Sequence, residues 1–426
     1  MKTVSILQRR SFLKQVIGGS LTALALPVLA NETPLQSIEA LPAMKDVADE
    51  QYWEMVKKQF AVPSNLTMMN AANLCPAPYL INEQVQSTLK GLSKDVSFQY
   101  RSQFAEKRKK SIELLANYVG VSKEEIGITR NTSESNNIIV NGLDLKPGDE
   151  VIVWDQNHPT NNIAWENRAK RYGFVVKKVV VPANPQTVDD LIAPFAKAIT
   201  SKTKLIGFSH ISNVSGIALP AKAICKLAKE KKILTLLDGA QSFGVLDLNL
   251  KDIGCDFYSG STHKWLMGPL ENGILYISKE NTDRVWPNII SAGWKDGSLT
   301  VDEKYCVLGQ RNDSTLAGLP ETIEFHQSIG KKNVEDRTRS LNAYLKEQIQ
   351  KKLPQAIFVT PLSPQLSAGV TVINFPEKKS TEVFQKLYES HGIACASTIG
   401  VRMSPHIYNS MGDIDKVVQA LSTLAA

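Results

Sequence analysis

Cysteine is scarce in this sequence, and its five residues are widely scattered. No two of them lie closer than 30 residues: Cys75, Cys225, Cys255, Cys306 and Cys395. The sequence therefore has no CxxC motif of the kind that binds zinc or exchanges disulfides, and we expect no metal site. It also has no closely spaced cysteines of the kind that staple small secreted domains. We expect the thiols to be free.

Internal repeats and low-complexity linkers are also missing, and the 25 glycines and 20 prolines follow no triplet period. Solenoid and collagen-like architectures are thereby excluded. With 43% hydrophobic and 21% charged residues, a chain of 426 residues has ample apolar material for a large core. Wholesale disorder is excluded as well, and the length predicts two or three domains.

The first thirty residues are typical of a cleaved export signal. The apolar stretch from Val16 to Ala30 contains Gly and Pro, and it is shorter than the roughly 20 apolar residues that a spanning helix needs. We therefore expect no stable membrane anchor. The preceding segment, Arg9-Arg10-Ser11-Phe12-Leu13-Lys14, resembles a twin-arginine (Tat) signal. That resemblance implies export by the Tat translocase to a bacterial periplasm, cleavage near Ala30 and a cofactor inserted before export; the alternative is a soluble N-terminal helix.

The positive charge of the chain comes largely from this signal. The formal net charge is +7. Cleavage would remove no acidic residue and four basic ones, Lys2, Arg9, Arg10 and Lys14, which leaves a net charge of +3. A charge this small makes no electrostatic case for a nucleic acid partner.

Short apolar runs alternate with amphipathic stretches between residues 111 and 278. Runs rich in Val, Ile and Leu are typical of strands buried on both faces, and amphipathic stretches such as 220–232 are typical of helices. The alternation predicts an α/β fold with a mostly parallel sheet flanked by helices. The predicted strands are Val151–Trp154, Val175–Val181, Leu205–Ser209, Ile233–Leu237, Asp256–Tyr258 and Ile274–Ile277.

The character of the sequence changes after residue 315. A long amphipathic stretch from Pro320 to Leu353 leads to a few strands, including Gly369–Asn374, and to a final helix from Asp413. We expect a smaller α+β C-terminal domain here. The predicted division is a signal at 1–30, an N-terminal segment at 31–75, a large domain at 76–315 and a small domain at 316–426.

Two polar segments follow neighbouring predicted strands of the large domain. Asp238 ends the strand that begins at Ile233, and Lys264 follows a strand in Ser261-Thr262-His263-Lys264-Trp265. Ligands of open parallel sheets bind outside the carboxyl ends of the strands. A buried carboxylate there needs a partner such as a protonated pyridine nitrogen, and a desolvated lysine can attack an aldehyde. Taken alone, the aspartate also suits a turn and the lysine the surface.

Three further polar segments add to these two. Thr132 and Ser133 begin a predicted helix and can either cap it or bind a phosphate. His158 follows the strand that ends at Trp154 and can stack on a ring or bond to its own loop, and Asn213 follows the strand that ends at Ser209. Together these groups suit one cofactor, pyridoxal phosphate (PLP).

From about Asn70 to the C-terminus, the sequence resembles the class V aminotransferase family, PLP-dependent enzymes of fold type I that include isopenicillin-N-epimerase-like enzymes and cysteine desulfurases. The resemblance implies a mostly parallel, seven-stranded-type sheet in the large domain. It makes Lys264 the lysine that holds the cofactor and then acts as acid and base, and Asp238 the partner of the ring nitrogen. It assigns the remaining cofactor contacts to Thr132, Ser133, His158, Asn213, Gln241, Ser261 and His263.

The same resemblance assigns the substrate carboxylate to Arg402, within the segment Arg402 to Asn409, and places Asn70 at the substrate. A guanidinium binds a carboxylate through two parallel hydrogen bonds. Family members carry a Gly-Thr pair that reaches the cofactor of the partner subunit, whereas this chain has Gly309-Gln310. We expect a homodimer in which Gln310 makes that contact.

These features predict a periplasmic PLP enzyme, of the aminotransferase or epimerase-like branch, that acts on a small-molecule amine or amino acid. Export suggests the tailoring of a secreted metabolite, such as a siderophore side chain. A cysteine desulfurase or related lyase is the second hypothesis. Cys395 lies only seven residues before Arg402, which is closer than the family spacing for a catalytic cysteine, so a buried cysteine is favoured. The third hypothesis is a binding protein without catalytic activity.

Overall fold

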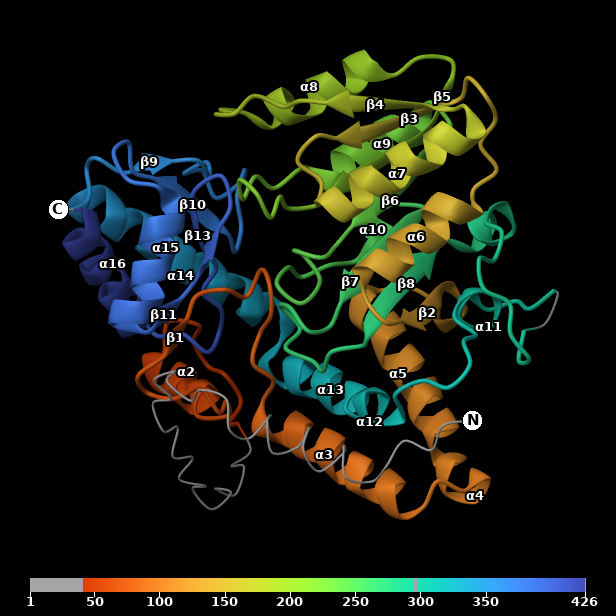
Figure 1. Cartoon of the computed structure of the whole chain (residues 1–426), viewed down its shortest axis with the longest axis horizontal. Helices are drawn as coiled ribbons and strands as arrows, with labels where there is room; N and C mark the ends of the chain where they lie inside the picture. Colours follow the sequence, from red (N-terminus) through yellow and green to blue (C-terminus); the bar gives the residue numbers. More distant parts are fainter. Residues whose placement is uncertain (1–40, 295–296, 426) are drawn as a thin grey trace, which may run out of the picture. The chain divides into compact units, whose positions relative to one another are not determined.

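A computed structural model describes residues 41–294 and 297–425 (Figure 1). The predicted export signal and its cleavage point lie outside the described residues. The described chain contains a seven-stranded sheet with helices on both faces and a smaller four-stranded sheet, as the sequence predicted.

The seven-stranded sheet is mostly parallel. Strand β8 runs antiparallel to both of its neighbours, β2 and β7, and the remaining pairs are parallel. Six strands therefore end at the same edge of the sheet. In spatial order the strands are β2 (Ile126–Thr129), β8 (Gly273–Ile277), β7 (Phe257–Ser261), β6 (Leu234–Asp238), β5 (Thr203–Ser209), β3 (Glu150–Trp154) and β4 (Val175–Val179).

Alternate residues of the central strands enter separate cores on the two faces. In β3, Val151 and Val153 pack with helices α6 (Thr132–Gly142) and α7 (Pro159–Tyr172). Ile152 and Trp154 belong to the other core. That core includes side chains of α5 (Gln103–Val119), α8 (Val188–Ala198), α9 (Ala221–Glu230) and α13 (Leu319–Ile329). Side chains alternate across a strand, so a strand that is apolar throughout needs cover on both faces.

Strand β4 differs from its prediction as a strand buried on both faces. It is the edge strand of the sheet, it ends at Val179, and Val175 is 48% exposed. Lys177 and Lys178 within it are typical of an edge that solvent reaches. An apolar run alone does not reveal whether a strand has a neighbour on each side.

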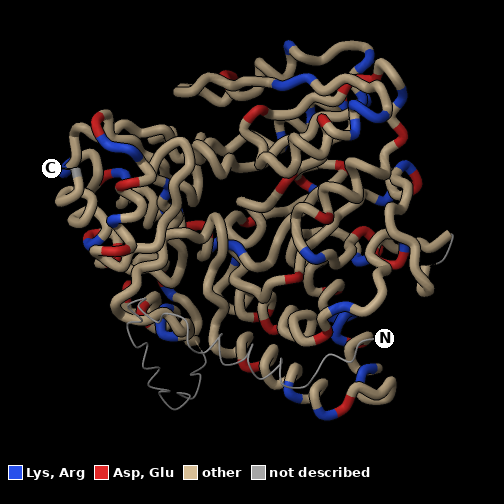
Figure 2. Tube along the Cα trace, in the orientation of Figure 1, with Lys and Arg blue, Asp and Glu red and all other residues tan. Residues whose placement is uncertain are grey.

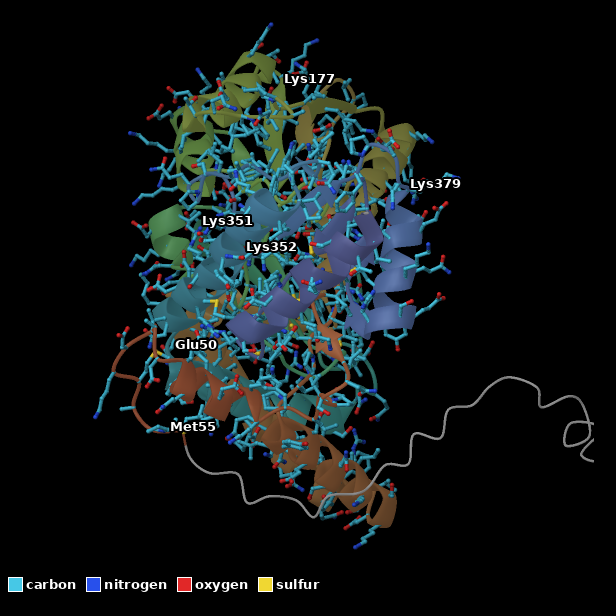
Figure 3. The ribbon with its side chains drawn as sticks, turned by 90° about the vertical axis from the view of Figure 1, so that its left-hand side faces the viewer. Glu50, Met55, Lys177, Lys351, Lys352 and Lys379 are labelled. Carbon is cyan, nitrogen blue, oxygen red and sulfur yellow. The ribbon has the colours of Figure 1, made fainter. Side chains whose placement is uncertain are left out.

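The small sheet is antiparallel and has a helical layer, which Figure 3 shows face on. Its strands, in spatial order, are β12 (Ala396–Ser397), β13 (Val401–Met403), β10 (Thr371–Asn374) and β9 (Ile357–Phe358). Side chains of α14 (Lys331–Lys352), α15 (Ser380–His391) and α16 (Met411–Ala425) share one apolar core with β10 and β13. Lys351 and Lys352, labelled in Figure 3, mark the end of α14.

The amphipathic stretch from Pro320 to Leu353 forms two helices, α13 and α14, that meet at Gly330. The φ angle of Gly330 is 93°, which side chains disfavour. The chain therefore turns here, and α13 packs on the large sheet while α14 packs on the small one.

A parallel two-stranded pair joins β1 (Thr67–Met68) to β11 (Ile393–Ala394). It ties the segment ahead of the large sheet to the C-terminal part of the chain. The remaining helices are α2 (Glu50–Lys57), α3 (Tyr79–Lys94), α4 (Phe98–Arg101), α10 (Leu250–Ile253), α11 (Val301–Tyr305) and α12 (Asp313–Ala317), with short 3₁₀ turns at Lys123–Glu125 and Lys279–Arg284.

Acidic and basic residues are interspersed over the described chain (Figure 2). Within residues 41–294 and 297–425, no helix is both long and apolar enough to cross a bilayer.

Candidate active site

The predicted site residues of the large domain lie at the edge where six strands end. Asp238 is the last residue of β6 and Ser261 the last of β7, while Thr132 begins α6 just after β2. His158 precedes α7, a few residues after β3 ends. Parallel strands end at one edge, so side chains far apart in the sequence are brought to one place.

Asp238 is a buried carboxylate held by neutral donors. Its side chain is 3% exposed. Oδ2 accepts hydrogen bonds from Asn136 Nδ2 at 2.8 Å and Asn161 Nδ2 at 3.5 Å, and Oδ1 accepts from the amide of Ala240 at 3.0 Å. Among the described residues, no basic side chain forms an ion pair with it. A buried carboxylate without a cation favours a positively charged ligand group nearby.

Lys264 lies in the loop between β7 and β8, and among the described residues its Nζ has no hydrogen-bond or ion-pair partner. Burial lowers the pKa of its amine; Asp238 opposes this shift and Arg402 adds to it. A lowered pKa increases the fraction of neutral amine, which is the nucleophilic form.

The start of α6 has the features of an anion site. The amide of Thr132 donates to Ser261 Oγ at 2.8 Å, and the two hydroxyls lie 2.7 Å apart. Asn131 Oδ1 accepts from the amide of Glu134 at 3.0 Å. The amide of Ser133 is left without a partner among the described residues. The helix dipole and this free donor favour a phosphate at this position.

His158 and His263 both follow the start of α6 in the sequence, His158 just before α7 and His263 just after β7. Burial and the nearby Lys264 lower the pKa of His263 to about 4, and its buried Nδ1 has no partner. The exposed His158 accepts the amide of Thr160 at Nδ1, 3.3 Å away, so Nε2 carries its proton. Partial burial is the main cause that lowers the pKa of His158. The positive charges of Lys264 and Arg402 lower it further, and the negative charge of Asp238 opposes them. Both rings are therefore neutral near pH 7.

Arg402, on β13, is 6% exposed and has no carboxylate partner among the described residues. Nη1 donates to the carbonyl of Asn213 at 3.1 Å, Nη2 donates to Asn70 Oδ1 at 3.0 Å, and the buried Nε has no partner. Burial lowers its pKa to about 10, and it remains charged at neutral pH. The structure thus brings Asn70, Asn213 and Arg402 together, and Arg402 needs an anion.

Gln241 and Gln310 make contacts that the sequence did not suggest. Gln241 Nε2 donates to the carbonyl of Ala72 at 2.8 Å, and its Oε1 accepts from Trp265 Nε1 at 2.9 Å. One N–H of Gln241 is left for a cofactor oxygen. The exposed Gln310 accepts from Arg101 Nη2 at 2.6 Å, and among the described residues it forms no hydrogen bond with Lys264 or Asp238. Its predicted contact with a partner subunit's cofactor stays a prediction.

Cys395 lies between β11 and β12, and it is 4% exposed. Burial raises the pKa of its thiol to about 12, and Arg402 opposes the shift only in part. All five cysteines are buried and free. The thiol of Cys395 is neutral near pH 7, and a neutral thiol is a poor nucleophile.

Several site residues were missed by the sequence reasoning. Asn136 and Asn161 hold Asp238 from helices α6 and α7, and His406 donates from Nε2 to the carbonyl of Trp265 at 2.7 Å. Asn136 lies one helical turn after Thr132, so it shares a helix face with the anion site. That spacing was the available signal for Asn136; the other two had none.

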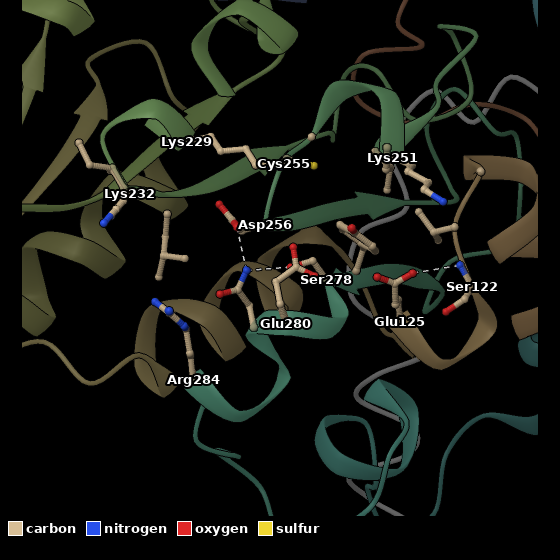
Figure 4. Close-up of a pocket in the computed structure, with 18 residues that line it drawn as sticks. Ser122, Glu125, Lys229, Lys232, Lys251, Cys255, Asp256, Ser278, Glu280 and Arg284 are labelled. Atoms are coloured by element: carbon tan, nitrogen blue, oxygen red, sulfur yellow. Dashed lines mark hydrogen bonds between the residues drawn. The ribbon is translucent and has the colours of Figure 1, made fainter. Parts of the chain in front are cut away.

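A pocket of about 840 Å³ lies at the other end of the strands (Figure 4). Residues at the start of β6 and β7 line this pocket, and two of its carboxylates form hydrogen bonds within the chain. Glu125 accepts the amide of Ser122, and Asp256 accepts from Thr235 and Asn281. None of the predicted site residues is among its described lining residues. Within the described ranges, no cluster of His, Cys, Asp and Glu could hold a metal ion.

The residues at the strand ends fit PLP. The free amide of Ser133 and the unpartnered Nδ1 of His263 suit the phosphate, the cation-free carboxylate of Asp238 suits a protonated ring nitrogen, and the unpaired amine of Lys264 suits the aldehyde. One PLP molecule would supply a partner to each of these unpaired polar groups. In a purely structural site, other protein groups would have bonded to them.

Known proteins of similar sequence and fold support this assignment. The family described as Aminotransferase class-V matches residues 77–418. The chain is 27% identical over 402 residues to the isopenicillin N epimerase of Amycolatopsis lactamdurans, which covers 88% of this chain and 98% of that protein. It is 29% identical over 341 residues to a probable cysteine desulfurase of Pyrococcus abyssi, covering 75% and 83%.

The fold is also that of a solved structure, the apo cysteine desulfurase of Thermococcus onnurineus NA1. The TM-score is 0.78 at 23% identity, covering 90% of this chain and 99% of that one. The family match spans most of the described residues, including every predicted site residue except Asn70. The chain therefore belongs to the class V aminotransferase family.

Proposed function

We propose that this protein is a PLP-dependent enzyme that acts at the α-carbon of a small molecule carrying an amino group beside a carboxylate. The observation that carries the proposal is the buried Arg402, which lacks an anionic partner and lies close enough to Lys264 to lower the pKa of its amine. A substrate carboxylate on Arg402 would place the neighbouring amine toward Lys264.

The cofactor is PLP, which when bound accepts electrons from the α-carbon as a bond to it breaks. Thr132, Ser133, Ser261 and His263 would hold its phosphate, and Asp238 would keep its ring nitrogen protonated. His158 would contact the ring by stacking, and Asn213 and Gln241 would supply further contacts.

The amine of Lys264 transfers the proton to and from the α-carbon of the substrate. Once the substrate amine is bound, the free amine of Lys264 would act as acid and base. The guanidinium of Arg402 orients the carboxylate, which selects the α-carbon bond that breaks.

The reaction is of the epimerase-like or aminotransferase kind. Similarity to isopenicillin N epimerase over 98% of that protein supports the epimerase-like branch. Exchange of the α-hydrogen for solvent deuterium with inversion, and without any keto acid, would identify an epimerase. Strict dependence on a keto acid would identify an aminotransferase.

A cysteine desulfurase is the second candidate, supported by 29% identity to the Pyrococcus protein. The neutral, buried thiol of Cys395 opposes it. Sulfide release from cysteine that is lost in Cys395→Ser would favour this candidate.

The protein is a periplasmic homodimer in this proposal. Arg9-Arg10 and the apolar stretch to Ala30 support export by the Tat translocase. Exposed apolar side chains, such as Phe98 at 87% and Trp286 at 75%, support a second copy as the partner, with Gln310 near that copy's cofactor. Export in turn supports a secreted substrate, such as an amino-acid group of a siderophore.

The test is a spectral screen of the purified mature holoenzyme. Amines and amino acids are added singly, the visible absorbance is followed, and products are identified by mass spectrometry. Compounds that keep the amine and lose the carboxylate should bind at least about tenfold more weakly. A holoenzyme that shows no visible band, or responds equally to both classes, would contradict the proposal.

A further inference from the structure

The loop that carries Lys264 has no regular secondary structure, so its position depends on individual hydrogen bonds. The carbonyls on either side of Lys264 are both bonded to other parts of the chain. The carbonyl of His263 accepts from the amide of Cys75 at 2.9 Å, and the carbonyl of Trp265 accepts from Nε2 of His406 at 2.7 Å. Lys264 is thus held between the segment ahead of the large sheet and the segment that follows β13.

The protonation state of His406 follows from its partners. A carbonyl oxygen only accepts hydrogen bonds, so Nε2 carries the proton and Nδ1 accepts from Thr338 Oγ1 at 3.2 Å. The ring is fully buried, and burial lowers its pKa to about 3. His406 is therefore a neutral, permanent donor to the loop.

Trp265, the neighbour of Lys264, is held at its side chain as well. Its ring lies edge to face with that of His406, with centroids 5.2 Å apart. Its Nε1 donates to Gln241 Oε1, and Gln241 in turn donates to the carbonyl of Ala72. The side chain of Trp265 is fully buried, so the loop has little freedom to move without breaking these contacts.

The segment that donates to the carbonyl of Trp265 in this loop is also the segment that carries Arg402. His406 lies four residues after Arg402, and the amide of Ser404 between them donates to the carbonyl of Met69 at 2.8 Å. One short, hydrogen-bonded segment therefore carries both the group expected to bind the substrate carboxylate and the donor that holds the lysine loop.

We propose that His406 is a positioning residue: through its bond to the carbonyl of Trp265 it sets the separation between the Lys264 amine and the Arg402 guanidinium. This inference rests on the proposed function, because it assigns the substrate carboxylate to Arg402. The separation decides where the α-carbon lies relative to the amine. Misplacement of a reacting group by about 1 Å can cost about 100-fold in rate.

The test compares two substitutions of His406 in the PLP-loaded full chain. His406→Gln can still donate to the Trp265 carbonyl and accept from Thr338. His406→Phe keeps a ring against Trp265 and loses both bonds. We expect His406→Phe to lower kcat about 10- to 100-fold with a smaller change in KM. We also expect the pH midpoint of the visible absorbance to rise by about half a unit or more, since a displaced Lys264 nitrogen is less buried and its protonated form is less disfavoured. His406→Gln should recover most of both properties.

Lys346→Met is the matched control. Lys346 is also buried, on α14, and donates to the carbonyl of Pro361 and to Ser367 Oγ, both at 2.7 Å. Like His406→Phe, this variant loses one hydrogen bond to a carbonyl and one with a hydroxyl. Neither of the lost bonds reaches the Lys264 loop. We expect a loss of melting temperature similar to that of His406→Phe, with kcat and the pH midpoint unchanged.

The inference would be overturned if His406→Phe lost melting temperature like Lys346→Met while its kcat and pH midpoint stayed at the wild-type values. Should His406→Phe fail to fold, Thr338→Val removes only the partner of Nδ1 and should show the same two shifts in weaker form; their absence would equally overturn the inference. A wild-type protein without a visible band would instead refute the proposed function, so the two failures are distinguishable.

Discussion

The guanidinium of Arg402 donates from Nη2 to Oδ1 of Asn70, 3.0 Å away, and this bond joins two segments that lie 332 residues apart in the sequence. A neutral amide satisfies one edge of the guanidinium without neutralising its charge. The positive charge is therefore kept for a ligand.

Asn70→Asp should give Arg402 an internal anion that competes with the substrate carboxylate. The side chain keeps its size, and an ion pair replaces a neutral hydrogen bond. We expect KM for a responding amino acid to rise on the order of tenfold, about 1.4 kcal/mol, with little change in kcat. Asn70→Ala, which adds no charge, should raise KM less. Steady-state kinetics measure both, and an unchanged KM in Asn70→Asp would refute the role given to Arg402.

Lys264→Ala should remove the amine that holds the cofactor and moves the proton. We expect the visible band of lysine-bound cofactor to disappear and activity to fall by at least about 1,000-fold, near the upper part of the range for acid and base catalysis. Lys346→Ala is the control, because Lys346 is also buried, and burial lowers the pKa of its amine to about 8. That variant should keep the band. Absorbance spectra and turnover assays distinguish the two.

Asp238→Asn should keep the shape of the side chain and lose its charge. Without the carboxylate, the ring nitrogen of the cofactor is no longer held protonated, and we expect kcat to fall about 100- to 1,000-fold. Asp256→Asn is the control at the other end of the strands, where the carboxylate only bonds Thr235 and Asn281. It should lower the melting temperature and leave kcat unchanged. Equal kcat values for the two variants would contradict the role of Asp238.

Cys395→Ser should leave activity toward responding amino acids within about twofold, because a neutral, buried thiol takes no part as a nucleophile. Cys225→Ser is a matched control, since burial also raises the pKa of that thiol to about 12. Sulfide assays with cysteine accompany the turnover measurements. A selective loss of sulfide release in Cys395→Ser would instead support the desulfurase candidate.

Acidic solution should destabilise the fold through its buried histidines. Burial lowers the pKa of His326 to about 4, below its ordinary value of about 6.5. Above pH 6.5 the ring is neutral in both states. Between pH 6.5 and 4 only the unfolded chain takes up the proton. Each unit by which the pH is lowered in this range therefore decreases the free energy of unfolding by up to about 1.4 kcal/mol for each such group.

His326→Gln should therefore flatten this dependence, because one titrating group is removed. Urea unfolding at several pH values from 7 to 4.5 measures the slope. Glutamine can still bond the carbonyl of Gly244, which His326 Nε2 meets at 2.7 Å. A slope equal to that of the wild type would show that His326 is accessible to protons in the folded state.

The strands of the large sheet were predictable from the sequence because they are buried on both faces. The runs that end at Trp154, Ser209 and Leu237 correspond to β3, β5 and β6 with small shifts in their ends. Strand β2 was not predicted. Its four residues include a glycine and a threonine, and it gains its stability from pairing with β8, which lies far along the chain.

The candidate site could be predicted in part. Residue types at strand ends indicated Asp238 and Lys264, because parallel strands deliver their ends to one edge. Hydroxyl residues at the start of a predicted helix indicated Thr132. The role of His406 could not be foreseen, since it depends on a contact between residues 141 positions apart. For Asn136 the spacing from Thr132 placed the side chain near the anion site, but its bond to Asp238, 102 residues away, had no signal in the sequence. The two helices α13 and α14 likewise read as one stretch, because both are amphipathic and only Gly330 separates them.

The sequence by itself determined the chemistry available to this protein: a lysine, an aspartate and hydroxyl groups at the ends of apolar strands, and an arginine near the C-terminus. Residue types and local periodicity are properties of the chain, so they can be read before folding. Only the tertiary structure decided that Arg402 is buried without a carboxylate, that Cys395 is a neutral thiol, and that His406 holds the loop of Lys264. Burial and long-range hydrogen bonds arise when distant segments pack together, and they set charge, pKa and position where the chemistry takes place.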